Sequence, residues 1–159
     1  MSELNVTAID PDRLNTMRHN GHDEHGNAWA PYPALGWEPL RCCLTVADVG
    51  SPIVLISYQP LPGPSPWAEV GPVYVHAEQC SGYATPDAVP PALAVGPRLL
   101  RTYHSDGTLD YEHIRTVAAG DPVEPILREL LDEPSVALVH LRAVESQCFT
   151  FAVTSERTA

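Results

Sequence analysis

The sequence predicts an α+β fold, in which a mostly antiparallel β-sheet of about six strands carries one main helix and an irregular N-terminal arm. Two observations lead to this class. From Leu40 onwards, short β-branched apolar runs alternate with Gly and Pro, which is typical of strands joined by turns. Residues 122–131 instead space their apolar side chains as one face of a helix. We expect residues 39–155 to form a single domain and residues 1–38 an arm packed on it.

The arm is polar and interrupted by prolines and glycines. One short helix is expected from Pro11 to about His19, because Asp10 can cap it and proline suits the first helical position. Large aromatic side chains in polar sequence usually bury against a neighbouring surface. Trp29 and Trp37 are therefore the expected anchors of the arm.

The strands are predicted from apolar runs bounded by turn residues. Residues 41–46 and 53–58 are expected to pair antiparallel across a longer turn. Residues 59–67 contain four prolines, which cannot donate to a β-ladder, so this stretch is a loop that would cover a site. The remaining strands are expected at 72–78, 98–104, 108–117, 136–143 and 148–153.

The second half of the chain contains a turn signal and a helix signal. Ser105-Asp106-Gly107 predicts the turn of a hairpin between residues 98–104 and 108–117. The one main helix, at 122–131, has Asp121 as its expected cap and is ended by Pro134.

The charge balance excludes several functions. The chain has 20 acidic residues, nine arginines and no lysine, and its formal net charge is −11. A nucleic-acid partner is not expected, because phosphate binding needs a basic surface. Without lysine, neither a pyridoxal phosphate Schiff base nor a Walker-type phosphate loop is possible. No dinucleotide-binding glycine motif is present.

The apolar runs and the cysteines bear on the compartment. The longest apolar runs are strand-sized, so no membrane span is expected. The N-terminus has neither a basic start nor an apolar stretch, and we expect a cytoplasmic protein. The four cysteines, of which Cys42 and Cys43 are adjacent, do not follow a disulfide pattern and are expected to be reduced thiols.

Several phrases of the sequence occur together in a known family: Arg41-Cys42-Cys43-Leu44, Gly71-Pro72-Val73-Tyr74-Val75-His76-Ala77-Glu78, Arg101-Thr102-Tyr103, and Val139-His140-Leu141-Arg142-Ala143 followed by Cys148-Phe149. The chain resembles the bacterial family called domain of unknown function 1203 over about residues 20 to 155. The resemblance implies one intact domain and supplies no catalytic residues.

A polar stripe is expected on the strand at 72–78. Side chains alternate along a strand, so Tyr74, His76 and Glu78 should face the same side. His76 and Glu78 are close enough to share a metal or a substrate, and Cys80 can join them only if the chain bends. The alternative is a half-exposed strand with a structural histidine.

The same parity argument separates the two adjacent cysteines. As part of a strand, Cys42 would point into the core and Cys43 would share a face with Arg41. A neighbouring cation favours thiolate, so Cys43 is the candidate reactive thiol. In the C-terminal hairpin, His140 and Cys148 are candidates for the same site, although each also fits a purely structural role.

Two functional hypotheses remain open. In the first, the chain is an enzyme or a small-molecule-binding domain, with a divalent metal as a candidate cofactor. Its candidate catalytic residues are His76, Glu78 and Cys43; its substrate-binding residues are Arg41, Tyr74, Glu69 and Arg142; and its metal ligands are His76, Glu78, Cys80, His140 and Cys148. In the second, the same residues only pack, and the chain is a non-catalytic protein-interaction module. The histidines between His19 and His25 are expected to belong to a solvated arm rather than to a metal site.

Overall fold

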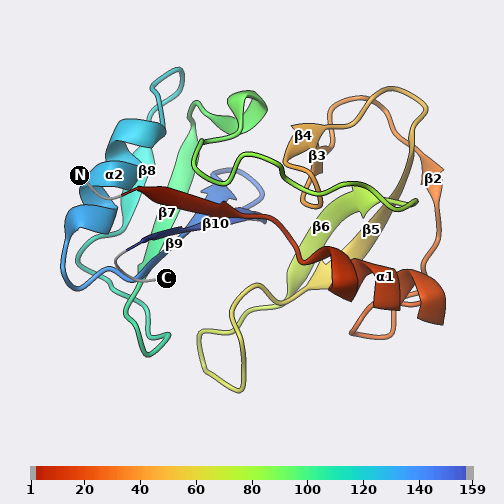
Figure 1. The fold of residues 1–159 in the computed structure, drawn as a ribbon, viewed down its shortest axis with the longest axis horizontal. Coiled ribbons are helices and arrows are strands. Elements are labelled where there is room, and N and C mark those ends of the chain that lie inside the picture. Colours follow the sequence, from red (N-terminus) through yellow and green to blue (C-terminus); the bar gives the residue numbers. More distant parts are fainter. Residues whose placement is uncertain (1–2, 157–159) are drawn as a thin grey trace.

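The computed structural model describes residues 3–156, which form two five-stranded β-sheets and two α-helices. Figure 1 shows the sheets towards opposite ends of the molecule, with β1 (Leu4–Thr7) leading from one end towards α1 (Pro11–Asn20) at the other. The predicted α+β class is confirmed, but the single six-stranded sheet is wrong. No helix in this part of the chain is long and apolar enough to cross a membrane.

The first sheet is antiparallel throughout, in the order β1-β10-β9-β7-β8. Its other strands are β7 (Arg98–Tyr103), β8 (Arg115–Val117), β9 (Leu138–Ala143) and β10 (Phe149–Ser155). Helix α2 (Glu124–Asp132) packs on one face, where Leu127 and Leu131 are buried against Leu100 and Phe151. The two antiparallel pairings predicted for the second half of the chain, β7–β8 and β9–β10, form, but β8 covers only residues 115–117 of the strand expected at 108–117.

The second sheet is mixed, in the order β2-β5-β6-β3-β4. Its strands are β2 (Tyr32–Pro33), β3 (Pro39–Leu40), β4 (Thr45–Val46), β5 (Pro52–Tyr58) and β6 (Gly71–His76). Strands β5 and β6 pair antiparallel over their full lengths, whereas β3 runs parallel to β6. Helix α1 buries Leu14 and Met17 in the same apolar cluster as Ile53 and Val75.

The prediction of a strand at 41–46 is wrong. Strands β3 and β4 pair through only two residues each, and residues 41–44 form the tight turn between them. The backbone N–H of Leu44 donates to the carbonyl of Leu40 at 2.9 Å, and Leu44 has a positive φ of 60°. Strand β5 pairs with β2 and β6 instead of this segment. Within the turn Arg41, Cys42 and Leu44 are buried, whereas Thr45 and Val46 are exposed.

Local chemistry explains the start of α1 and the end of α2, but not the start of α2. The Asp10 carboxylate accepts from the backbone N–H of Asp12 at 2.9 Å, as predicted for α1. Helix α2 stops before Pro134, because the residue that precedes a proline, here Glu133, adopts an extended backbone. The predicted cap Asp121 is wrong: α2 starts two residues later than a cap there would require, and Val123 occupies the cap position without a side-chain hydrogen bond.

The N-terminal segment is more regular than expected. It contributes an edge strand to each sheet, β1 to the first and β2 to the second, in addition to α1. Trp29 is half-buried and donates from Nε1 to the carbonyl of Ala77 at 3.3 Å, whereas Trp37 is 59% exposed. The deepest contacts of this segment come from aliphatic side chains such as Ile9 and Leu14 rather than from the tryptophans.

Candidate functional site

The turn at residues 41–44 brings two thiols next to a histidine. The Sγ atoms of Cys42 and Cys43 and a ring nitrogen of His76 all lie within 4.8 Å of one another. Cys42 is buried, whereas Cys43 and His76 are partly exposed. Because both cysteines belong to a turn, the parity argument that pointed them to opposite sides does not apply. The structure therefore joins Cys42, which we assigned to the core alone, to Cys43 and His76.

Backbone pairing fixes the turn beside the end of β6. Leu40 lies opposite Tyr74 in the parallel β3–β6 pair, and the backbone N–H of Arg41 donates to the carbonyl of Tyr74 at 2.9 Å. Two residues further along β6, the N–H of His76 donates to the Cys42 sulfur at 3.3 Å. The parallel register thus sets the distance between the thiols and the imidazole.

The two thiols have opposite acidities. A hydrogen bond from the Cys42 thiol is the main reason that the pKa of Cys43 lies well below its usual value, although burial acts in the other direction. The hydroxyl of Thr45, 3.1 Å from the Cys43 sulfur, lowers the pKa of Cys43 further. As the proton donor in that pair and as a buried group, Cys42 has a raised pKa. Cys43 is therefore the more acidic of the two thiols.

The bend that follows β6 is held by a residue that the sequence did not single out. The Arg18 guanidinium, from α1, donates to three successive carbonyls, at 3.4 Å to His76, 2.8 Å to Ala77 and 3.1 Å to Glu78. This bend carries the chain on to Cys80, which packs in the same apolar cluster as Cys42 and acts electrostatically on its thiol. The one sequence signal for Arg18 was a basic residue in the last turn of an expected helix.

Glu78 and Cys80 do not belong to the tight group. Glu78 is exposed, and neither side chain lies within the mutual 4.8 Å of the three donor atoms. Two thiolates and an imidazole are a donor set that zinc binds well, and three protein ligands leave a fourth position for water or for another ligand. Cys80 is the candidate for that fourth position, because it packs in the same apolar cluster as Cys42.

The arrangement expected for His140 does not form. His140 lies on β9 of the first sheet and His76 on β6 of the second, so the two strands are not neighbours. The His140 ring lies between those of Tyr103 and Phe149, at centroid distances of 4.8 and 4.9 Å. Burial is the main cause that lowers the pKa of His140 to about 3, so its imidazole is neutral at physiological pH.

The other predicted polar residues lie where the two sheets meet. The Glu69 carboxylate, in the proline-rich loop, pairs with Arg101 at 2.9 Å and with Arg142 at 3.3 Å. One carboxylate therefore joins two arginines, one from β7 and one from β9. Arg41 is buried and donates from Nε to the carbonyl of Phe149 at 2.8 Å, so its guanidinium extends towards β10. The low pKa of Cys43 thus has a different cause from the one we expected.

The histidine-rich segment of the arm is organised by a carboxylate. Asp23 is buried and accepts backbone hydrogen bonds from His25, Asn27 and Ser57 at 2.8 to 2.9 Å. His22 and His25 remain exposed. Within residues 3–156 no group of potential metal ligands forms in this segment.

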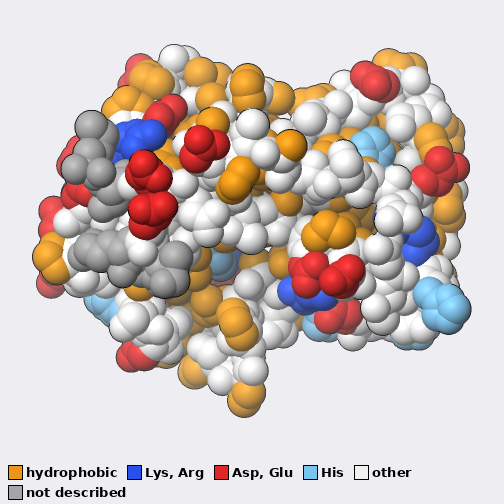
Figure 2. All heavy atoms as spheres, viewed as in Figure 1, with side chains coloured by type: hydrophobic (Ala, Val, Ile, Leu, Met, Phe, Trp, Pro, Cys, Tyr) orange, Lys and Arg blue, Asp and Glu red, His pale blue; other side chains and the backbone are white. Residues whose placement is uncertain are grey.

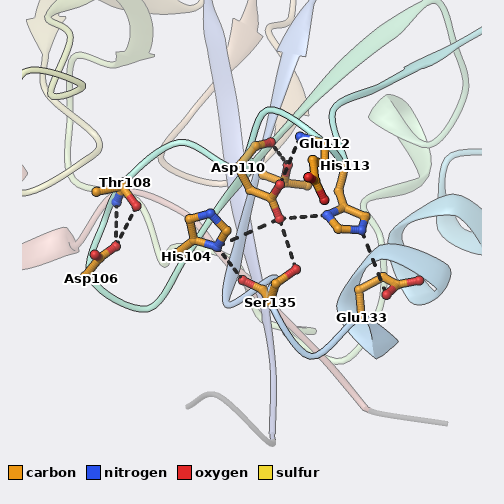
Figure 3. A network of polar contacts seen from close by, with 9 residues as sticks. His104, Asp106, Thr108, Asp110, Glu112, His113, Glu133 and Ser135 are labelled. Atoms are coloured by element: carbon orange, nitrogen blue, oxygen red, sulfur yellow. Dashed lines mark hydrogen bonds and ion pairs between the residues drawn. The ribbon is translucent and has the colours of Figure 1, made fainter.

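Figure 3 shows a second polar network that the sequence did not indicate. The buried Asp110 carboxylate accepts hydrogen bonds from Nδ1 of His113 at 2.8 Å, the Ser135 hydroxyl at 3.2 Å and the backbone N–H of Glu112 at 3.0 Å. Burial alone would raise the pKa of Asp110, but these three bonds hold it below its usual value. Because Ser135 donates to the carboxylate and not to an imidazole, the network ties two loops together and is not a nucleophile–base pair.

Among the comparisons with known proteins, one family model matches most of the chain. The curated proteins and the solved structures contain no match. A family model described as "Protein of unknown function (DUF1203)" matches residues 37–155, which include β3 to β10 and the three donor residues. The chain belongs to this family, as the phrases around Cys42, His76 and Cys148 predicted.

Proposed function

We propose that the protein binds a divalent, thiophilic metal ion, with zinc as the best fit, through Cys42, Cys43 and His76. One observation carries this proposal: three donor atoms of suitable chemistry lie within 4.8 Å of one another. Thiolate and imidazole are the ligands that protein zinc sites use most, and the distances between them match a shared ion after small side-chain adjustments.

The electrostatics of the group support metal binding. Cys43 needs no strong base to lose its proton, because its pKa is already low. Neither ring nitrogen of His76 makes a hydrogen bond within the described residues, so the imidazole is available as a ligand. The raised pKa of Cys42 means that metal binding releases a proton there, and affinity should therefore increase with pH.

The fourth ligand decides what the metal does. With Cys80 as fourth ligand, the ion would be closed off and would hold the turn against the end of β6. With water in that position, the ion would be open to a small molecule, as in catalytic zinc sites. The three tight donors and the more distant Cys80 favour the open form, and a metal-dependent small-molecule function follows from it.

The test is a metal titration of the purified chain. Protein prepared without chelators is assayed for bound metal by elemental analysis, and apoprotein is titrated with Co²⁺, whose visible spectrum reports thiolate ligation. We expect one ion per chain for the parent protein and a loss of binding in Cys43→Ser and His76→Gln. Cys148→Ser is the matched control, because this cysteine lies outside the group, and it should bind like the parent.

Two results would contradict the proposal. One is a parent protein that binds no stoichiometric metal at micromolar concentrations. The other is retention of full affinity in both Cys43→Ser and His76→Gln. Far-ultraviolet circular dichroism of each variant separates loss of a ligand from loss of the fold.

A further inference from the structure

A second pocket, away from the thiol group, lies where the two sheets meet. It has a volume of about 270 Å³ and is lined from both sheets, by Tyr74 on β6 and Leu55 on β5 on one side and by Arg98 on β7 and Thr150 on β10 on the other. Its walls are largely apolar. Such a pocket, with few convergent polar groups, is the usual form of a small-molecule site.

Two guanidinium groups in this pocket lack a carboxylate partner. The Arg98 side chain makes no hydrogen bond within the described residues, and its buried Nε has no partner. Arg41 donates from Nε to Phe149 and from Nη1 to Pro39, but both acceptors are neutral backbone carbonyls. A buried positive charge without a counter-charge is costly, so the pair favours an anion between them.

Unlike Arg41 and Arg98, the neighbouring arginines do have a carboxylate partner. Arg101 and Arg142 line the adjoining pocket and share Glu69. Four of the nine arginines of a chain with net charge −11 thus lie around the junction of the sheets, with Glu69 as the one acidic residue among the linings of these two pockets. The face shown in Figure 2, by contrast, carries several groups of acidic side chains and few arginines. The junction is therefore the place where an anion would be attracted.

Aromatic side chains in the lining of this pocket can contact the apolar part of a ligand. Trp37 is 59% exposed, yet its ring packs edge-on against Tyr74 at a centroid distance of 5.7 Å. The buried Glu38 carboxylate accepts hydrogen bonds from the backbone N–H groups of Leu35, Gly36 and Trp37, which holds the loop in place. An exposed tryptophan on a fixed loop provides a flat contact for an aromatic or aliphatic group.

We propose that this pocket binds a small organic anion, with its oxyanion head group between Arg41 and Arg98 and its apolar body against Trp37. The head group is a carboxylate or a phosphate, both of which match the planar guanidinium. Cys148 also lines this pocket, and its thiol will be covered when the anion is bound.

Four probes test the proposal: benzoate, phenyl phosphate, inorganic phosphate and benzyl alcohol. Binding is measured by calorimetry and by the rate at which iodoacetamide modifies Cys148, mapped by mass spectrometry. Benzoate or phenyl phosphate should bind saturably and slow the modification of Cys148 but not that of Cys43. Inorganic phosphate, which lacks the apolar body, and benzyl alcohol, which lacks the charge, should bind more weakly. The comparison of benzoate with phenyl phosphate identifies the preferred head group.

Variants assign the binding to these residues. Arg98→Gln should weaken the binding of the better probe by roughly 10- to 100-fold, since it removes charge-assisted hydrogen bonds. Arg101→Gln is the matched control: this arginine is on the same strand, but it pairs with Glu69 and lies outside the lining of this pocket, so affinity should be unchanged. Trp37→Ala, at an exposed position, should keep the fold and weaken benzoate more than inorganic phosphate.

Three outcomes would overturn the proposal. The first is that no probe binds saturably or protects Cys148. The second is that benzyl alcohol binds as well as benzoate, which would mean that the arginines contribute nothing. The third is equal affinity in Arg98→Gln and Arg101→Gln. If Arg98→Gln does not fold, an unchanged benzoate affinity in Trp37→Ala would also overturn the proposal.

Discussion

The replacement Asp110→Asn tests how much the network in Figure 3 stabilises the fold. The Asp110 carboxylate accepts three hydrogen bonds, from His113, Ser135 and the backbone of Glu112. Hydrogen bonds to a charged group contribute about 1 kcal/mol more than neutral ones, so removing the charge should cost about 3 kcal/mol at neutral pH. The side chain is almost completely buried, and water cannot replace these bonds.

The pH dependence of this cost has a definite sign. The native contacts hold the pKa of Asp110 below its unfolded value. The contribution of the carboxylate is therefore fully present above about pH 4 and is lost as the pH falls through the native pKa. The difference in stability between the parent and Asp110→Asn should shrink between pH 7 and about pH 3.

Urea denaturation followed by circular dichroism at both pH values measures this difference. The control is Asp106→Asn, because Asp106 is exposed and, within residues 3–156, its carboxylate accepts hydrogen bonds only from Thr108 in the same loop. It should cost less than about 1 kcal/mol. A loss below about 1 kcal/mol for Asp110→Asn at pH 7, or an equal loss at both pH values, would refute the reasoning.

Three further predictions follow from the geometry. Arg18→Met should lower the free energy of unfolding by about 2 to 4 kcal/mol, because three backbone carbonyls lose their donor, and a loss below about 1 kcal/mol in a urea titration would contradict this. Under native conditions, a thiol reagent should modify Cys43 before Cys42, because Cys43 is partly exposed and has a low pKa; mass-spectrometric mapping that finds Cys42 first would reverse this order. His140→Phe should change stability by no more than about 1 kcal/mol, since Nδ1 has no partner to lose, and a large loss of thermal stability would show an interaction that we have not identified.

The sequence predicted those parts of the fold that depend on neighbours in the chain. The antiparallel pairs β7–β8 and β9–β10 were found because each consists of two apolar runs that follow one another in the chain with turn residues between them. Helix α2 was found because its leucines repeat at helical spacing. The division into two sheets was missed, because no local pattern states which strands pair at long range. Strands β3 and β4, with two residues each, are too short to show any alternation.

The composition of the candidate site was predicted better than its geometry. His76 and Cys43 were selected for their chemistry, and the structure brings them together. Cys42 was assigned to the core because the apolar run around it was interpreted as a strand. The turn depends on a leucine with positive φ at residue 44, which is uncommon for a residue with a branched side chain, and no sequence rule would place it there.

The same turn explains how residues 41–43 contribute side chains to two different parts of the molecule. Leu44 reverses the chain, so the thiols of Cys42 and Cys43 face the end of β6, while the Arg41 guanidinium reaches the carbonyl of Phe149 on β10. In a strand, Arg41 and Cys43 would lie on one face and could act on the same ligand. In the turn they are divided between a thiol–imidazole group within the second sheet and a cationic pocket between the sheets. The residues expected to form a single polar site are therefore divided between two groups, and we predict that a substitution at Cys43 and one at Arg98 affect different ligands.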